Sequence, residues 1–124
     1  MKKEVVISIG SNTDDAHAQV LGALNWLANV LSEVHCSSIY TTAALHGGST
    51  YTNAVAIGWS DMELSHLQAL LKDYEIDCGR DEAMRAQHLV PIDLDVVIYD
   101  SEVLKERDFQ QNFFTKGYNE LNQL

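Results

Sequence analysis

The chain has 124 residues, of which 46% are hydrophobic and 21% are charged, a composition ordinary for a soluble domain that buries a core. Its 18 acidic and 8 basic residues give a net charge of −10, which argues against nucleic acid or an anionic membrane as a partner. No segment has the length of a membrane span or the pattern of a secretory signal, so we expect one cytoplasmic domain over residues 1–124.

The two cysteines, Cys36 and Cys78, have no metal-ligand spacing, and we expect both thiols to be reduced and buried. The five histidines show no zinc-type pairing with each other or with the cysteines. A zinc site is therefore not expected. In so acidic a chain, any phosphate site must be built locally from a few Lys or Arg side chains, helix N-termini and a metal ion.

The first part of the chain predicts a strand, a helix and a second strand. Residues 4–9 alternate between apolar and polar positions and end at the turn residues Gly10-Ser11-Asn12. Residues 13–15 favour a helix start, and apolar residues then recur at intervals of three and four up to Leu31. Residues 34–42, rich in β-branched side chains and Tyr, predict the next strand.

The second part predicts a loop over residues 43–50, a strand over 51–59, a second helix and a final strand. Ser60 and Glu63 match a capping box before the helix, and Gly79 suits a left-handed end after it. The charged residues 80–90 are expected to form an irregular loop, followed by the strand within residues 91–99.

The element order β-α-β-β-α-β predicts an α+β, ferredoxin-like fold. In this topology an antiparallel sheet carries two helices on one face and loops over the other. Residues 100–124 are polar and aromatic and give only weak structural signals, so no structure is predicted for them.

Asp93 and Asp95 lie two residues apart in an otherwise apolar strand. Side chains alternate in a strand, so both carboxylates leave the same face, roughly 7 Å apart. The apolar residues share the other face: Ile92, Leu94, Val96 and Ile98. Paired hard oxygen ligands suit one or two Mg²⁺ ions, which usually bind together with phosphates. Two solvated acids on an exposed strand face are an equal alternative.

Three further positions carry polar groups where structure alone does not require them. Tyr51 and Asn53 share a strand face, and an Asn amide there offers donors and an acceptor to a flat heterocycle, or satisfies the neighbouring backbone instead. Glu75 falls on or beside the apolar stripe of the second helix. Its carboxylate either extends to solvent or accepts hydrogen bonds from something bound.

The segment after Gly79 supplies Arg80, Arg85 and His88, which could clamp phosphates in this acidic protein. A surface loop with balanced charge is the alternative, because Asp81 and Glu82 adjoin Arg80. The residues at the end of the first strand match no dinucleotide fingerprint or P-loop.

Together these residues resemble the 6-hydroxymethyl-7,8-dihydropterin pyrophosphokinase family of folate biosynthesis. The resemblance extends from about Val5 to Val103, and more faintly to Tyr118. It is carried by five short motifs in matching order: Ile9-Gly10-Ser11-Asn12, Tyr40-Thr41-Thr42, Tyr51-Thr52-Asn53-Ala54, Glu75 ahead of Gly79-Arg80, and Ile92-Asp93-Leu94-Asp95.

The resemblance implies a ferredoxin-like fold and transfer of a pyrophosphoryl group from ATP to the pterin hydroxymethyl group, with release of AMP. Asp93 and Asp95 would then hold two Mg²⁺ ions that bridge the ATP phosphates, and Arg80 would meet the phosphates. The implied pterin-binding residues are Thr42, Ala43, Tyr51, Asn53 and Tyr118. The implied residues around pterin and nucleotide are Glu75, Arg85, His88 and Lys116.

Several family positions differ in this chain. Glu82, Gln87 and Val90 stand where the family usually has Arg, Trp and Arg, its His-Tyr pair after the Asp strand is not visible, and the chain ends soon after Tyr118. An active but divergent and weak enzyme is therefore one hypothesis, and a lapsed homologue that only binds pterin or nucleotide is another. An interaction domain that uses the open sheet face is the third. The sequence does not determine the oligomeric state.

Overall fold

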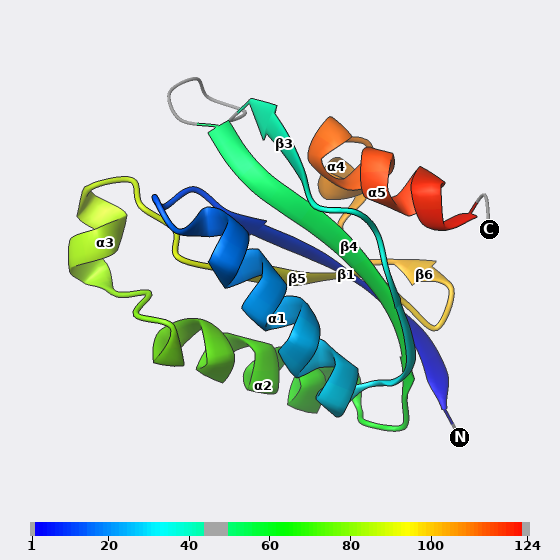
Figure 1. The fold of residues 1–124 in the computed structure, drawn as a ribbon. Helices are drawn as coiled ribbons and strands as arrows, with labels where there is room; N and C mark the ends of the chain where they lie inside the picture. Colours follow the sequence, from blue (N-terminus) through cyan, green and yellow to red (C-terminus); the bar gives the residue numbers. More distant parts are fainter. Residues whose placement is uncertain (1, 44–49, 123–124) are drawn as a thin grey trace.

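The structure, a computed structural model, describes residues 2–43 and 50–122 (Figure 1). Its strands are β1 (Lys3–Ser11), β2 (Ser32–Cys36), β3 (Tyr40–Ala43), β4 (Thr50–Ser60), β5 (Asp93–Tyr99) and β6 (Glu102–Val103). Its helices are α1 (Ala16–Val30), α2 (Leu64–Asp77), α3 (Glu82–Ala86), α4 (Glu106–Phe109) and α5 (Asn112–Asn122). Most of the predicted loop over 43–50, including Gly47-Gly48-Ser49, lies outside the described residues.

The strands form one antiparallel sheet in the order β2-β4-β1-β5-β6, with β3 also paired to β4. Helices α1 and α2 pack on one face of this sheet, which confirms the predicted α+β, ferredoxin-like arrangement. The opposite face carries α5, where we expected loops.

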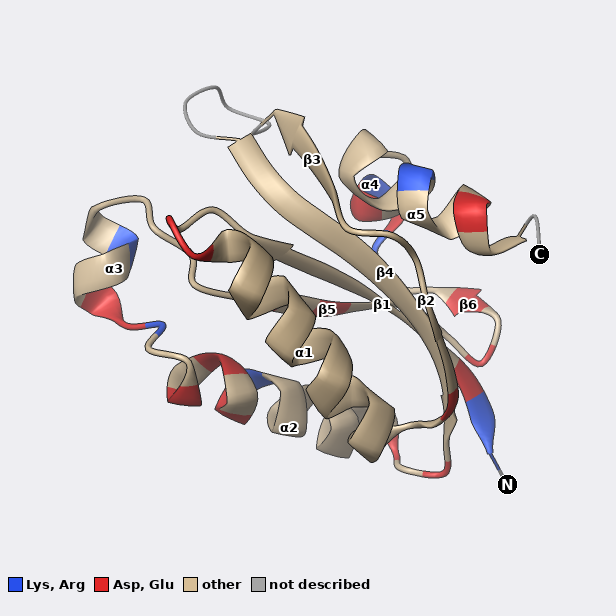
Figure 2. Ribbon diagram, in the orientation of Figure 1, with Lys and Arg blue, Asp and Glu red and all other residues tan. Residues whose placement is uncertain are grey.

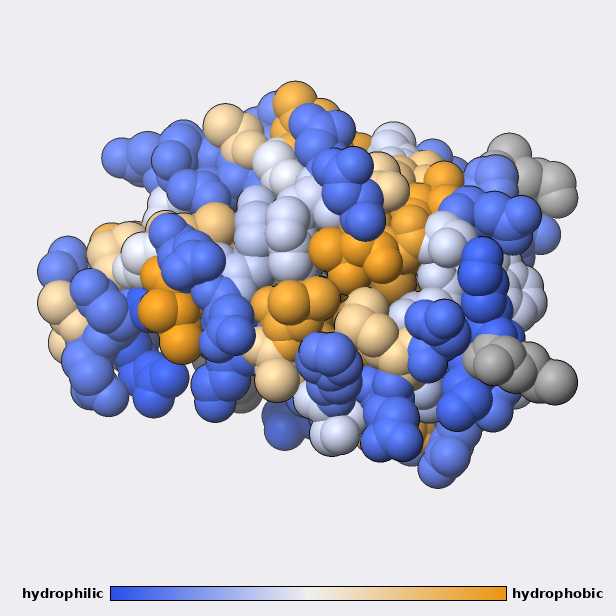
Figure 3. All heavy atoms as spheres, turned by 90° about the horizontal axis from the view of Figure 1, so that it is seen from below, coloured by the Kyte–Doolittle hydropathy of each residue, from blue (hydrophilic) through white to orange (hydrophobic). Residues whose placement is uncertain are grey.

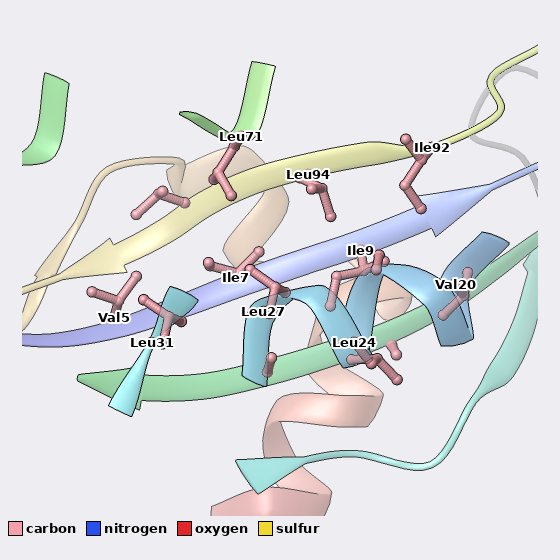
Figure 4. Close-up of a cluster of buried hydrophobic side chains, with 14 of the residues drawn as sticks. Val5, Ile7, Ile9, Val20, Leu24, Leu27, Leu31, Leu71, Ile92 and Leu94 are labelled. Carbon is pink, nitrogen blue, oxygen red and sulfur yellow. The ribbon is translucent and has the colours of Figure 1, made fainter. Parts of the chain in front are cut away.

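The main core lies between the sheet and the two helices (Figure 4). Val5, Ile7 and Ile9 point from alternate positions of β1 into this layer, because strand side chains alternate between faces. They meet residues of α1 such as Leu24 and Leu27, which recur at helical spacing. Each fully buried aliphatic side chain stabilises the fold by about 1.5–3 kcal/mol.

A β-bulge corrects one prediction for β5. Val6 of β1 pairs with Ile98 while the next residue, Ile7, pairs with Val96, so Val97 is an extra residue in β5. An extra residue reverses the alternation beyond it. Ile98 therefore lies on the α5 face, and the prediction that it shares a face with Leu94 was wrong for this residue. The buried residues on that face form a second cluster, called the α5 cluster below: Val6, Val55, Val97, Ile98, Phe114 and Leu121.

The strand predicted over residues 34–42 is interrupted, which corrects a second prediction. β2 ends at Cys36 and β3 begins at Tyr40. Between them the Ser37 hydroxyl accepts a hydrogen bond from the backbone N–H of Val55 (2.9 Å), in place of a ladder carbonyl. Ser38 is bound through its N–H and hydroxyl to the carboxylate of Glu120 in α5 (3.0 and 2.8 Å).

The ends of α2 agree with prediction in part. Gly79 follows the helix with φ +98°, the left-handed conformation expected there. The capping box is wrong: Glu63 itself is the N-cap residue and makes no side-chain cap bond. Ser60 instead accepts a hydrogen bond from the N–H of Met62 (3.1 Å), so it closes a local turn before the helix.

Both cysteines are free, as expected, but neither is fully buried: Cys36 is exposed and Cys78 is intermediate. The expectation of two buried thiols was therefore wrong. Cys36 lies in β2, whose described pairing is with β4 alone, so one side of this strand faces solvent.

Residues 100–122, for which no structure was predicted, are largely helical. Asp100 and Ser101 have positive φ values (52° and 70°) and form the tight turn into β6. α5 then buries Phe114, Gly117 and Leu121, one face of the helix, against β4. At Gly117 an added Cβ would lie 2.7 Å from Val55 Cγ2, so only glycine permits this close approach.

The surface seen from the side of α2 is mostly hydrophilic, with a smaller apolar area near its centre (Figure 3). Ile76 of α2 is an exposed apolar side chain, with 57% of its surface accessible. Among the helices in residues 2–43 and 50–122, none combines the length and apolar character needed to cross a membrane.

Candidate functional site

The strand register places two predicted site residues, Asn53 and Asp93, in one row across the sheet with Gly10 between them. Asn53 of β4 pairs with Gly10 of β1, and Gly10 pairs on its other side with Asp93 of β5. Neighbouring strands lie about 4.8 Å apart, so the amide and the carboxylate stand on either side of the glycine. The next row on this face, toward the α5 cluster, contains Ser8 and Asp95.

Gly10 keeps the space between these side chains open. An added Cβ would lie 3.3 Å from Asn53 Oδ1 and 3.6 Å from a ring carbon of Tyr51. Asn53 and Tyr51 therefore both border the position directly above Gly10. A flat ligand placed here would rest on backbone, with polar groups on both sides.

Asn53 is 2% exposed, and its amide donors are already used inside the protein. Nδ2 donates to Thr42 Oγ1 (2.8 Å) and to the carbonyl of Tyr51 (3.2 Å). Its Oδ1, which points toward the space above Gly10, remains as an acceptor. The site thus offers an oriented acceptor at this position, and Thr42 on β3 fixes that orientation.

Glu75 connects α2 to the edge of the sheet. Its Oε2 accepts a hydrogen bond from the backbone N–H of Leu94 (2.7 Å), and its Oε1 lies 3.1 Å from Arg80 Nη1. Burial raises the pKa of Glu75, and the Leu94 N–H and the Arg80 charge act in the opposite direction. The predicted acceptor role is filled here by the protein's own backbone and guanidinium.

Arg80 is the central cation of the site. Its Nη1 donates to Asp93 Oδ1 (2.9 Å) and to the carbonyl of Ile92 (3.3 Å), besides its contact with Glu75. Its backbone N–H also donates to the carbonyl of Glu75 (3.2 Å). One guanidinium thus joins the end of α2 to the start of β5.

Asp95 has less compensation for its charge. Burial, and then the neighbouring Asp93 carboxylate, raise the pKa of Asp95 to about 7. Lys105 Nζ lies 3.6 Å from Asp95 Oδ1, a longer contact than that between Arg80 and Asp93. A partly buried carboxylate with so little compensation favours a second cation at this position.

A cavity of about 520 Å³ opens beside these residues, between α2, the segment with α3, and β5. Its lining includes four basic residues: Lys72, Arg80, Arg85 and Lys105. The whole chain has only eight, and Figure 2 shows how sparse basic residues are elsewhere on the ribbon. Acidic residues line the same cavity: Glu75, Asp81, Glu82, Asp93 and Asp95.

The predicted loop over residues 80–90 contains the short helix α3, capped by the Asp81 side chain, which accepts from the N–H of Met84 (2.9 Å). Its far end is fastened to the turn after β1. Asn12 donates from Nδ2 to the carbonyl of His88 (2.8 Å) and accepts from the N–H of Val90 at Oδ1 (2.6 Å). The Asn12 N–H donates to the Val90 carbonyl (3.1 Å).

The remaining predicted site residues lie on three segments: the segment that follows α2, helix α5 and the end of β3. Arg85 lines the cavity, and His88, with φ 59°, lies at the bend where Asn12 holds the segment. Lys116 lies on α5 with its ammonium 5.4 Å from the ring centroid of Tyr40. Tyr118 stacks on Phe114 (centroids 5.1 Å apart) inside the α5 cluster. Ala43 ends β3, exposed.

Sequence reasoning missed two residues. The sequence placed Asn12 in a turn and in one of the family motifs, but gave no sign that its side chain binds a segment distant in the chain. Lys105 lies in a polar stretch where a lysine is unremarkable, and its approach to Asp95 follows from tertiary structure. No local pattern signals that contact.

The donor set fits a hard cation that brings ligands of its own. No group of three or more His, Cys, Asp or Glu side chains suited to a metal occurs within residues 2–43 and 50–122. Two partly exposed aspartates remain, with side chains 40% and 27% accessible. Mg²⁺ commonly takes one or two carboxylates and completes its shell with water and substrate phosphates.

Comparison with known proteins gives a clear family match. The model of the family described as 7,8-dihydro-6-hydroxymethylpterin-pyrophosphokinase (HPPK) matches residues 6–123, nearly the whole chain. No match was found among curated proteins.

Proposed function

The chain belongs to the 7,8-dihydro-6-hydroxymethylpterin-pyrophosphokinase family, and on this premise we propose that it transfers pyrophosphate from Mg-ATP to 6-hydroxymethyl-7,8-dihydropterin. The observation that carries this proposal is the row of Asn53, Gly10 and Asp93. In this row the amide acceptor of Asn53 lies near a carboxylate pair, and the adjoining cavity is lined by both basic and acidic side chains. Both substrates of a pyrophosphoryl transfer can thus meet at one sheet edge.

The pterin would lie above Gly10. Its ring edge carries N–H groups that can donate hydrogen bonds to Asn53 Oδ1, and its flat face can pack against Tyr51. Thr42 would act through Asn53, whose amide it holds in place. The hydroxymethyl group would then point toward Asp93, the next residue in the row.

The nucleotide would occupy the cavity between α2 and β5. Asp93 and Asp95 would hold Mg²⁺, two ions by the family resemblance, which neutralise phosphate charge when bound. Arg80 would contact the phosphates, supported by Glu75. Arg85, His88 and Lys116 are further candidates for nucleotide or pterin contacts.

The reaction would form one bond and break one. The hydroxymethyl oxygen attacks the β-phosphorus of ATP. The bond between this phosphorus and the oxygen that bridges it to the α-phosphorus breaks, and AMP leaves with that oxygen. The hydroxyl proton passes to a nearby carboxylate or to water. Such transfers need positioning and charge neutralisation more than covalent help, and this arrangement of aspartates and Arg80 can supply both.

A lapsed enzyme that only binds pterin or nucleotide is the second candidate. Glu82 favours it, because this carboxylate lines the cavity where phosphates would bind. Repulsion between Glu82 and the phosphates would destabilise the transition state. If the enzyme is active, we therefore expect a low turnover number.

The two candidates separate in one assay. Purified protein is incubated with ATP, Mg²⁺ and 6-hydroxymethyl-7,8-dihydropterin, and the AMP formed is measured, with each component omitted in turn. We expect AMP only when all three are present, and a loss of at least 100-fold in Asp95→Asn. Saturable pterin binding without AMP formation would favour the lapsed enzyme instead.

A further inference from the structure

Lys105 approaches the carboxylate pair from a different part of the chain than the other basic residues of the cavity. It lies between β6 and α4, while Lys72, Arg80 and Arg85 belong to α2 and the segment that follows it. Its ammonium is 3.6 Å from Asp95 Oδ1, and its side chain is 47% exposed. Lys105 is therefore a cation beside Asp95 with room to move.

The backbone of Lys105 is fixed, although its side chain is not. The neighbouring Leu104 donates its N–H to the carbonyl of Val97 in β5 (2.8 Å). The carbonyl of Lys105 accepts from the N–H of Phe109 (2.9 Å), and Phe109 packs in the α5 cluster. These contacts hold the Lys105 Cα beside Asp95 while the flexible stem can redirect the ammonium.

Arg80 cannot move in the same way. Its guanidinium is engaged by Glu75, by Asp93 and by the carbonyl of Ile92. Lys105 has one ion pair among the described residues, the long contact with Asp95. Any ligand that needs a mobile cation on the β5 side of the cavity must obtain it from Lys105.

A divalent cation at Asp95 would repel an ammonium at 3.6 Å, because both charges would compete for one carboxylate. The lysine would then turn away from Asp95, and the cavity it already lines is the space within its reach. A polyphosphate arriving with the metal supplies acceptor oxygens there.

We propose that Lys105 leaves Asp95 when Mg-ATP binds and contacts the β- or γ-phosphate, on the side of the polyphosphate opposite Arg80. This inference rests on the proposed function, since it assumes that the cavity takes Mg-ATP. Lys105 thereby serves first as a counter-ion for the empty carboxylate pair and then as a phosphate ligand.

A purely structural counter-ion would behave differently. Removing such a lysine would leave Asp95 freer for Mg²⁺ and would leave nucleotide affinity unchanged or improved. A phosphate ligand, once removed, weakens the binding of Mg-ATP, because a charge-assisted hydrogen bond to the nucleotide is lost. The two roles therefore predict opposite changes in nucleotide affinity.

The test compares Lys105→Met, Lys105→Arg and the wild-type chain by calorimetry. Lys2→Met is the control, because it removes the same charge from an exposed residue outside the cavity. The ligands are the α,β-methylene analogue of ATP with Mg²⁺, AMP with Mg²⁺, and Mg²⁺ alone. Circular dichroism and thermal unfolding establish that each variant is folded.

For Lys105→Met we expect the Mg²⁺–analogue complex to bind about 10- to 100-fold more weakly, AMP to bind unchanged, and Mg²⁺ alone to bind equally or more tightly. Lys105→Arg should restore most of the loss, and Lys2→Met should match the wild type. Unchanged or tighter analogue binding by Lys105→Met would overturn the inference.

The outcome separates this inference from the proposed function. If the wild-type protein forms AMP but Lys105→Met binds the analogue as tightly as the wild type, only the phosphate contact is rejected. A wild-type protein that binds the analogue through Lys105 but forms no AMP rejects the transfer alone. A wild-type protein that does not bind the analogue rejects both.

Discussion

At the scale of single residues, Asp95 is the side chain with the strongest electrostatic conflict. Burial and the Asp93 carboxylate raise its pKa to about 7 from the ordinary value of 3.8, although Lys105 lowers it. The folded chain thus binds a proton at Asp95 more readily than the unfolded chain does between these two values. The contribution of Asp95 to the free energy of unfolding therefore falls as the pH rises from about 4 to about 7.

Asp95→Asn should remove this penalty. We expect the metal-free variant to be more stable than the wild type by about 1–3 kcal/mol at pH 8, with little difference at pH 4. Urea unfolding at several pH values measures this difference, with exposed Asp73→Asn as the control. A variant less stable than the wild type at pH 8 would contradict the assigned charge conflict.

Asn53 illustrates how a polar residue in a strand can be both structural and functional. Its donors hold Thr42 and the Tyr51 carbonyl, and its acceptor is left for a ligand. The residue accordingly has two separable contributions.

We expect Asn53→Ala to raise the KM for the pterin at least tenfold and to lower the free energy of unfolding by about 1–3 kcal/mol. Thr42→Val loses only the hydroxyl that accepts from Asn53, so its effect on the pterin KM should be smaller. Steady-state kinetics at saturating Mg-ATP give both values. Equal effects of the two substitutions would argue against a direct contact between Asn53 and the pterin.

At the scale of elements, the α3 segment is attached mainly at its two ends. α3 has no buried residue, Arg80 fixes the beginning of the segment, and Asn12 fixes its end. The position of Arg85 therefore depends on a few hydrogen bonds more than on packing.

Asn12→Ala should release the segment without unfolding the domain. We expect faster amide exchange and proteolysis within residues 81–89, a shift in the thermal midpoint of no more than a few degrees, and a higher KM for Mg-ATP. Asn29→Ala is the matched control, since Asn29 donates only to a carbonyl of its own helix. Unchanged exchange in residues 81–89 would mean that Asn12 does not hold the segment.

The packing of α5 makes a second prediction at this scale. At Gly117 an added Cβ would lie within 3.0 Å of Val55, Tyr40 and Ser37, whereas at Gly22 in α1 the nearest atom is 3.7 Å away. Gly117→Ala should therefore destabilise the protein by about 1–3 kcal/mol. Gly22→Ala should be neutral or stabilise it by up to about 1 kcal/mol. Denaturant midpoints test the pair, and equal effects would contradict the packing of α5.

The sequence predicted the elements whose signals are local. Alternation in β1 and β4 and helical periodicity in α1 and α2 were sufficient for the topology, because these patterns do not depend on distant residues. The break between β2 and β3 was missed, since it accompanies a bond from Ser38 to Glu120, 82 residues away. α5 was missed although Phe114, Tyr118 and Leu121 recur at helical spacing, a local signal that the polar and aromatic segment already contained.

The site was predictable to a similar extent. Asp93, Asp95 and Asn53 are polar residues in apolar strands, so their sequence context already sets them apart. The role of Glu75 in joining α2 to Leu94 and Arg80 needed coordinates, as did the approach of Lys105 to Asp95. Contacts between exposed charges and distant segments have no sequence pattern of their own.

At the level of the whole molecule, the site adjoins the main core, because Leu71, Leu94 and Val96 belong to that core and also line the cavity. The main core lies between the sheet and α1 and α2, while the aspartates stand on the opposite face, at the β5 side of the sheet. Half of the chain's basic residues gather at one cavity in a molecule of net charge −10. Because Glu75, Asp81, Glu82, Asp93 and Asp95 line the same cavity, a polyphosphate would need bound Mg²⁺ as well as these cations to offset its charge.

We propose that this cavity and the row above Gly10 form one site for pyrophosphoryl transfer. The most direct measurement is product identity after incubation with Mg²⁺, 6-hydroxymethyl-7,8-dihydropterin and ATP, by mass spectrometry and quantitative chromatography. We predict AMP and pyrophosphorylated pterin in equal amounts, both reduced at least 100-fold for Asp95→Asn and both retained for Asp73→Asn. ADP with a singly phosphorylated pterin, or no pterin product at all, would contradict the account.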